Sequence, residues 1–391
     1  MTHERHRFQT VRRAFPLTSL AIVLAVAVSA CARDDASPRS SAIEAYRQRM
    51  LANPAADTVG GATVAVIVGD RVVWAEGFGW ADRGKRIPAS VETIYRIGSL
   101  TKTFTAVVLM QLVAAGTVQL DDPVEKYLPE IRGLASPRPG GKPVTLRMLA
   151  SHTAGIIREP ALPGAAAGPI AEWENKLLAS IPTTAFDADP GTRYEYSNVG
   201  FGILGLTLSR AAKKPYMQMV EEGVLQPLGM YSSTFIIDER LQRWLSVGYE
   251  LGASGIDTVT PALEHLGRGY KVPNGGIYST VIDLARFMGA LSGASKGVTT
   301  EPLRVMMETK QTPEAGVEGY GFGVQISQQG IVGHGGSVAG YTAQFDFDPA
   351  TKIGVIVLSN GRIGNGSGLQ LLQALVQEMR GGLLSRTLLS P

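Results

Sequence analysis

Strand-type segments stand at the two ends of this chain, and helix-type segments lie between them. Two apolar runs near the N-terminus flank Gly69-Asp70, and two near the C-terminus flank a turn at 348–351, as is typical of antiparallel hairpins. The four runs are 62–68, 71–78, 341–347 and 352–358. This order predicts an α+β fold in which both chain ends build one antiparallel sheet, flanked by helices, around an inserted, mainly helical region.

Helical spacing supports that division. We expect helices at 43–52, 103–115, 145–151, 202–212, 283–291 and 368–379. We therefore expect the sheet to be formed from about 43–95 and 270–391, and the helical region to comprise about 96–269. Of 391 residues, 45% are apolar and 18% charged. The length allows two or three domains, or one large single-site enzyme, and the composition allows a sizeable core and excludes wholesale disorder.

The first thirty residues are typical of an export signal. Four arginines from Arg5 to Arg13 precede a short apolar run at 17–28. The run is shorter than the ~20 residues of a membrane-spanning helix. It ends in Ser29-Ala30-Cys31, which resembles the lipobox of bacterial lipoproteins, where the cysteine is acylated. We expect a lipoprotein signal peptide at 1–30, lipid on Cys31 and a solvated tether at 31–42.

Charge and cysteine content exclude several kinds of partner and site. The formal net charge is +3, but the signal holds four of the 37 basic and one of the 34 acidic residues, so 33 of each remain. A neutral mature chain has no bulk attraction for nucleic acid. Cys31 is the only cysteine, which excludes an internal disulfide, a zinc knuckle or an iron–sulfur site. We expect no metal and no cofactor.

Two glycine-rich segments match catalytic motifs only in part. Residues 79–86 lack the final Ser or Thr of a phosphate-binding P-loop, so a surface turn is expected. Residues 293–297 match the Gly-x-Ser-x-Gly of a nucleophile elbow, but they follow a helix-type segment and not a buried strand. A helix end and a loop are expected there.

Ser99-Leu100-Thr101-Lys102 is the strongest candidate for a catalytic site. A serine hydroxyl is a weak nucleophile unless a neighbouring group takes its proton. In a helix, a lysine three residues further on lies one turn above the serine on the same face. The apolar stretch after Lys102 predicts a buried helix, and Ser99 would lie at its N-terminus, where the backbone N–H groups favour developing negative charge.

Two further motifs follow in order, Tyr196-Ser197-Asn198 and His334-Gly335-Gly336. With Ser99-x-x-Lys102, they make the chain resemble the penicillin-recognising serine hydrolases, in the branch of class C β-lactamases, DD-peptidases and related esterases. Other stretches resemble landmarks of that family in the same order. They are 95–98, 120–124, 149–155, 190–191, 227–230 and 274–276. The resemblance covers about 43 to at least 360.

The resemblance implies a β-lactamase/transpeptidase-like fold over 43–391, with Ser99 as nucleophile. It implies that Lys102 and Tyr196 act as a unit, and which of them is the base stays open. Asn198 would bind a substrate amide and hold Lys102. His334, Gly335 and Gly336 would bind substrate along an edge strand, where glycines leave it room. The N–H groups of Ser99 and Ser337 would form the oxyanion hole.

His334 departs from the lysine that class C β-lactamases usually carry at this position. A histidine with its ordinary pKa of ~6.5 is mostly neutral at pH 7, so it attracts a substrate carboxylate weakly unless a neighbour raises that pKa. This favours D-amino-acid peptides or small esters over β-lactams. His152 resembles a structural landmark, and His265 is expected to be a surface or core residue.

The sequence thus predicts a secreted, lipid-anchored serine hydrolase that acts on small-molecule or peptide substrates. A class C-like β-lactamase is the close alternative. A non-catalytic penicillin- or peptidoglycan-binding envelope protein is the alternative of another class. We expect no nucleic-acid partner. Contact with a membrane is expected only through the lipid, on the periplasmic side. An outer membrane is expected, because Ala32 replaces the aspartate that commonly retains lipoproteins in the inner membrane. The oligomeric state and the export route, general or twin-arginine, stay open.

Overall fold

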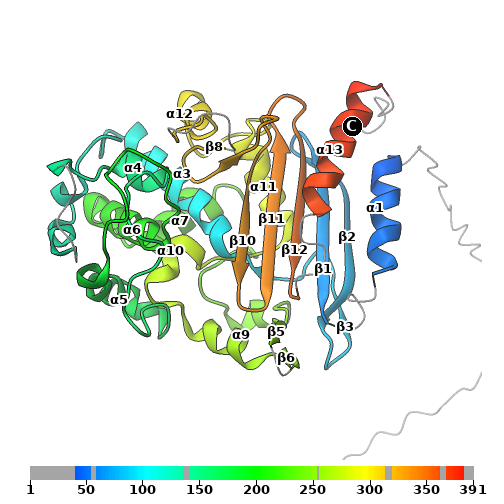
Figure 1. The fold of residues 1–391 in the computed structure, drawn as a ribbon. Helices are drawn as coiled ribbons and strands as arrows, with labels where there is room; N and C mark the ends of the chain where they lie inside the picture. The colour runs from blue at the N-terminus through cyan, green and yellow to red at the C-terminus, as the bar shows by residue number, and fades with distance from the viewer. Residues whose placement is uncertain are drawn as a thin grey trace, which may run out of the picture. The chain divides into compact units, whose positions relative to one another are not determined.

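The central sheet joins the two ends of the chain (Figure 1). In the computed structural model its eight strands run in the order β3-β2-β1-β12-β11-β10-β9-β8, and neighbours are antiparallel. The strands are β1 (Gly61–Val68), β2 (Arg71–Asp82), β3 (Ile87–Pro88), β8 (Gly319–Tyr320), β9 (Gln325–Ile326), β10 (Val332–Val338), β11 (Tyr341–Asp348) and β12 (Ile353–Ser359). The predicted α+β fold, with a sheet from both chain ends, is confirmed.

The structure describes six stretches of the chain, all within one compact unit, Arg39–Pro391. They are 40–53, 59–134, 141–252, 255–312, 319–361 and 367–382. The predicted signal peptide at 1–30, Cys31 and most of the tether lie outside these residues. Within the stretches listed, no helix combines the length and apolarity that crossing a bilayer requires.

Both faces of the sheet are covered. On one face, α1 (Ser41–Leu51) and α13 (Ser367–Arg380) pack on alternate residues of β1 such as Val64 and Val66. On the other face, Ala65 and Ile67 pack against the helical region. Because both faces are buried, every residue of β1 is buried. Figure 1 shows α1 and α13 on the side of the sheet away from the helices of the middle of the chain.

The helical region lies between the two groups of strands in sequence. Its α-helices are α3 (Thr101–Ala114), α4 (Leu146–Ala150), α5 (Trp173–Ser180), α6 (Asn198–Ala212), α7 (Tyr216–Val220), α8 (Glu239–Gln242), α9 (Val259–Leu263), α10 (Val272–Gly275), α11 (Val281–Leu291) and α12 (Glu301–Met307). Two small sheets pair β4 (Tyr95–Arg96) with β7 (Tyr278–Ser279), and β5 (Glu250–Gly252) with β6 (Gly255–Asp257). The first ten residues of α3 are all buried, as the apolar run predicted.

Helix starts differ from the prediction where a side chain caps the helix. The Ser40 hydroxyl accepts a hydrogen bond from the N–H of Ile43, so α1 begins at Ser41, inside the predicted tether. The Ser197 hydroxyl accepts from the N–H of Gly200, so α6 begins at Asn198 and not at 202. The second difference places Asn198 of the Tyr-x-Asn motif in the first turn of a buried helix.

The two glycine-rich segments have no catalytic geometry. Strand β2 continues to Asp82, so the turn expected over 79–86 occupies only its second half, before β3. Helix α11 ends at Leu291, and the segment 293–297 follows it as turn and bend, as predicted. The two-residue turn at Gly69-Asp70 also matches the prediction, with Val68 opposite Arg71.

Candidate active site

Ser99 lies in one turn of 3-10 helix, Gly98–Leu100, between β4 and α3. The turn packs against β10, and Gly98 makes this approach possible. A Cβ on Gly98 would lie 3.0 Å from the N atom of Ser337, and the residue has φ +52°. A Cβ on Gly336 would lie 2.0 Å from the carbonyl oxygen of Ile97 and 3.1 Å from the N atom of Ser99. The backbone around the two predicted oxyanion donors is therefore in close contact.

Lys102 is in the first turn of α3 and is fully buried. Its Nζ lies 3.1 Å from Ser99 Oγ, 2.7 Å from Asn198 Oδ1 and 3.2 Å from the carbonyl oxygen of Asn274. The predicted stacking of Lys102 above Ser99 is confirmed. The two carbonyl-type oxygens can only accept hydrogen bonds.

Burial lowers the pKa of Lys102 well below its ordinary value, and the nearby cations Arg158 and Arg268 lower it further. The uncharged amine has two N–H groups and one lone pair. If the N–H groups go to Asn198 Oδ1 and Asn274 O, the lone pair is left for the Ser99 hydroxyl. This arrangement suits removal of the serine proton.

Tyr196 lies directly before the cap of α6, with its ring centroid 4.7 Å from Lys102 Nζ. Its hydroxyl also interacts with Ser99, but burial dominates and raises the pKa of Tyr196 to about 12. The phenol is therefore protonated at neutral pH. Of the two bases left open by the sequence, the lowered pKa favours Lys102.

His152 packs against Tyr196, which fits the structural role expected for it. Its ring is fully buried and packs on the Tyr196 ring with centroids 4.2 Å apart. Nδ1 accepts a hydrogen bond from the N–H of Ser197 at 3.0 Å. Burial lowers the pKa of His152 well below 6.5, so the ring is neutral.

Asn198 connects Lys102 to Glu159. While Oδ1 accepts from Lys102, Nδ2 donates to Glu159 Oε1 at 2.6 Å. Glu159 also accepts from the Tyr270 hydroxyl and forms an ion pair with Lys271 at 3.1 Å. Asn198 thus holds Lys102, as the resemblance implied, and one of its amide hydrogens is committed to a carboxylate.

His334 is part of β10, and the residue is buried, with 1% of its surface exposed. Nδ1 lies 2.6 Å from the carbonyl oxygen of Gly335, which can only accept, so Nδ1 carries the proton. Nε2 then accepts from the Tyr320 hydroxyl at 2.9 Å. Burial lowers the pKa of His334 to about 3. The ring is therefore neutral at neutral pH.

The cleft above Ser99 has a volume of about 570 Å³. It is lined by Ser99, Arg158, Tyr194, Tyr196, Gln325, His334, Gly335, Gly336, Ser337, Thr342, Ala343 and Gln344. Arg158 supplies a positive charge in this lining, with its guanidinium carbon 4.7 Å from the centre of the Tyr196 ring.

A family model described as Beta-lactamase matches residues 45–378. The chain belongs to the beta-lactamase family. The match contains all three motifs, and the class predicted from the sequence, a β-lactamase-related serine hydrolase, is the class of this family.

Relatives of known name agree with this placement. D-alanyl-D-alanine-carboxypeptidase/endopeptidase AmpH of Escherichia coli (strain K12) is 35% identical over 231 residues, which are 58% of this chain and 56% of AmpH. The chain thus spans little more than half the length of that relative. The octameric penicillin-binding protein homologue from Pyrococcus abyssi superposes with a TM-score of 0.72 at 29% identity, covering 87% of this chain and 77% of the homologue. A class C beta-lactamase structure shares the fold at 21% identity, with a TM-score of 0.69 and coverage of 86% and 94%.

The structure brings together the site residues predicted for this beta-lactamase family member. The residues from the three motifs converge on one cleft or its wall, while Cys31 lies outside the described residues. Sequence reasoning missed Arg158, Glu159, Tyr320 and Gln344. None of them stands in one of the three motifs.

Proposed function

We propose that this protein is a serine hydrolase that forms an acyl-enzyme on Ser99 with amide or ester substrates. The observation that carries the proposal is the position of Lys102, whose amine is fully buried within hydrogen-bond distance of Ser99 Oγ and of two carbonyl-type oxygens. A buried amine with a lowered pKa is a competent base near neutral pH.

In the acylation step, Ser99 Oγ forms a bond to the substrate carbonyl carbon while its proton moves to Lys102 Nζ. The carbonyl oxygen becomes an oxyanion, which the N–H groups of Ser99 and Ser337 stabilise. The bond from carbon to the leaving nitrogen or oxygen then breaks. The leaving group takes a proton from Lys102 directly or through the Tyr196 hydroxyl, which is protonated at neutral pH.

Deacylation repeats these transfers with water. The neutral amine of Lys102, with the Tyr196 hydroxyl as relay, takes a proton from a water that attacks the acyl carbon. The bond between that carbon and Ser99 Oγ breaks, and Oγ recovers a proton. The same two residues thus serve both half-reactions.

We favour D-amino-acid peptides or small esters as substrates. His334 is neutral, so β10 offers no fixed cation for the carboxylate of a β-lactam. Arg158 lines the cleft next to the Tyr196 ring, where it can attract the free carboxylate of a peptide C-terminus. The DD-carboxypeptidase name of AmpH agrees with this preference. A class C-like β-lactamase remains the second candidate, supported by the shared fold.

Covalent labelling tests the catalytic proposal against a non-catalytic envelope-binding role. The folded protein is incubated with a fluorophosphonate, a reporter penicillin and a p-nitrophenyl ester, and its intact mass is followed. We expect an adduct on Ser99 that Ser99→Ala abolishes. A folded protein that no probe labels would be a binding protein and not a hydrolase.

Substrate class is tested at Arg158. Arg158→Gln should lower kcat/KM for a D-alanyl-D-alanine peptide by tenfold or more, as expected for loss of a charge-assisted contact, and should affect an uncharged ester much less. Arg193→Gln removes the same charge from an exposed position outside the cleft lining and serves as the control. Faster turnover of nitrocefin than of the peptide by the unmodified protein would favour the β-lactamase alternative.

We further propose that the protein is exported and anchored by lipid on Cys31, at an outer membrane. The arginine-rich start, the short apolar run and the single cysteine support this. Metabolic labelling with a fatty acid should mark the wild-type protein and not Cys31→Ser. Unlabelled wild-type protein in a fraction without membranes would contradict it.

A further inference from the structure

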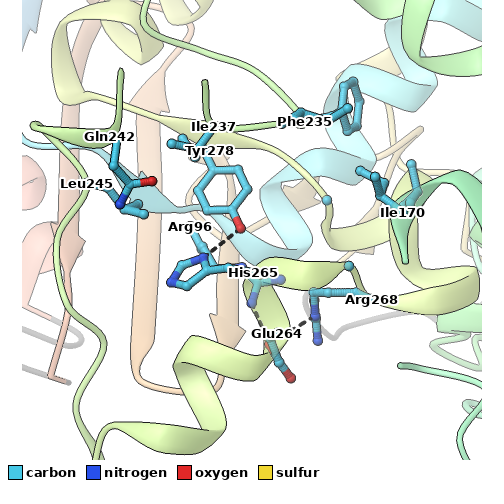
Figure 2. Close-up of a pocket in the computed structure, with 14 residues that line it drawn as sticks. Arg96, Ile170, Phe235, Ile237, Gln242, Leu245, Glu264, His265, Arg268 and Tyr278 are labelled. Atoms are coloured by element: carbon cyan, nitrogen blue, oxygen red, sulfur yellow. Dashed lines mark hydrogen bonds and ion pairs between the residues drawn. The ribbon is translucent and has the colours of Figure 1, made fainter. Parts of the chain in front are cut away.

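A second hollow, separate from the cleft, lies between β4, β7 and the segments before α8 and α10. Its volume is about 200 Å³, and Figure 2 shows its lining. Arg96, in β4, contributes from one side, and Arg268 contributes from the segment before α10. Arg268 Nη1 donates to the carbonyl oxygen of Gly275 at 3.3 Å, next to Asn274, whose carbonyl accepts from Lys102.

The floor of the hollow carries more positive than negative charge. Arg96 Nη1 and Arg268 Nε lie 2.7 Å and 3.1 Å from the same oxygen, Glu264 Oε2. Burial lowers the pKa of His265 to about 4, so that ring is neutral. Two guanidinium groups therefore share one carboxylate, and one positive charge in the lining has no counter-ion there.

Part of the arginine hydrogen-bonding capacity is unused. The Arg96 side chain is 1% exposed, and its Nε has no hydrogen-bond acceptor among the described residues. Arg268 Nε is close to Glu264 but is not aligned for a hydrogen bond. Buried guanidinium N–H groups are normally satisfied, because an unsatisfied charged donor is costly. Such a pair is suited to receive an anion.

Part of the wall of the hollow is apolar. Figure 2 shows Ile170, Phe235, Ile237 and Leu245 around the hollow, with Gln242 and Tyr278 among them. An inorganic anion would leave this wall without a partner. For comparison, an apolar cavity of ~150 Å³ holds one benzene molecule. The hollow therefore has room for one small ring or a short aliphatic chain.

We propose that this hollow binds a small organic monocarboxylate, with its carboxylate at Arg96 and Arg268 and its apolar body against Leu245 and Phe235. The two guanidinium groups supply the charge complement, and the apolar wall selects an organic body over a hydrated inorganic ion. The site is distinct from the Ser99 cleft, because no residue lines both.

Benzoate is a suitable probe, and benzamide is its neutral counterpart of the same shape. Isothermal titration calorimetry on the full chain should show saturable 1:1 binding of benzoate, and benzamide should bind at least tenfold more weakly. Labelling Ser99 with a fluorophosphonate first should leave benzoate binding intact, since the cleft is a different site. Loss of binding on labelling would assign benzoate to the cleft and overturn the proposal.

Two variants with matched controls locate the site. Arg268→Gln should weaken benzoate binding by tenfold or more, whereas Arg243→Gln, which removes an exposed charge outside this lining, should not. Leu245→Trp should fill the hollow and abolish binding, whereas Leu251→Trp, at a position 59% exposed, should not. If Arg268→Gln fails to fold, Leu245→Trp still decides. Equal benzoate affinity in wild type and Leu245→Trp would refute the site.

Discussion

Replacing Gly336 by alanine should lower both the rate of catalysis and the free energy of unfolding. The new Cβ would lie 2.0 Å from the carbonyl oxygen of Ile97, whereas ordinary contacts are about 3.5 Å, so β10 and the Ser99 turn must move apart by about 1 Å or more. That shift moves the N–H of Ser337 away from the N–H of Ser99. Oxyanion donors act over 2.7–3.1 Å, and loss of one costs about 10²–10³ in kcat. Overpacking should also lower the free energy of unfolding by about 1–3 kcal/mol.

Two neighbouring glycines provide controls on the same strand. A Cβ on Gly333 would lie 2.2 Å from Asp346 Oδ1, a similar overlap away from Ser99, so Gly333→Ala should lose stability but keep acylation. A Cβ on Gly335 meets only Gln344 Oε1, at 2.8 Å, the end of a flexible side chain. Gly335→Ala should therefore have the mildest effect on stability.

Burst-phase acylation by a p-nitrophenyl ester, measured per folded molecule, is the assay for catalysis. Urea denaturation measures the free energy of unfolding. Near-wild-type acylation in Gly336→Ala would show that the close contact with Ile97 does not set the oxyanion geometry. An equal loss of acylation in Gly333→Ala would show that strain anywhere in β10 is enough to slow acylation, whether or not it lies next to Ser99.

Three further outcomes are expected. Lys102 must be neutral to accept the serine proton, so kcat/KM for an ester should fall as the pH drops through the lowered pKa of Lys102. Lys102→Arg keeps a charged side chain at this position, so its kcat/KM should be about 10²–10⁴-fold below that of the wild type across the pH profile. Tyr320→Phe leaves Nε2 of buried His334 without a donor and should lower the free energy of unfolding by about 1–3 kcal/mol in urea titrations; an unchanged value would contradict the hydrogen bond. Burial raises the pKa of Asp346 to about 7 in the folded state, whereas the carboxyl group has a pKa of about 3.9 in the unfolded chain. Between these values the folded state binds a proton that the unfolded state has lost, so the free energy of unfolding should decline as the pH rises from about 4 to about 7. Asp346→Asn should flatten that slope in thermal melts at matched pH values.

The sequence predicted the features that depend on local spacing. Two hairpins, a buried helix after Ser99 and the approach of Lys102 to Ser99 all follow from short-range periodicity and were confirmed. The charge state of His334 was also predicted in direction, because an ordinary histidine is mostly neutral at pH 7. The structure adds the reason, which is burial of the ring.

Contacts between distant segments could not be predicted. Glu159 reaches Lys102 only through Asn198, and the position of its loop depends on Tyr270 and Lys271 from another part of the chain. No spacing rule connects such residues. Helix starts were missed by a few residues for a simpler reason, since a capping serine decides them and the apolar period does not.

The pairing of β1 with β12 has a consequence for the order of folding. β1 is made early and β12 near the end of synthesis, so the centre of the sheet cannot close until almost the whole chain exists. Contacts of such long sequence separation form slowly. Until then β1, which is buried along its whole length in the native state, is an apolar strand with an open edge and a liability for aggregation. A chain truncated before Ile353 should therefore collect in inclusion bodies.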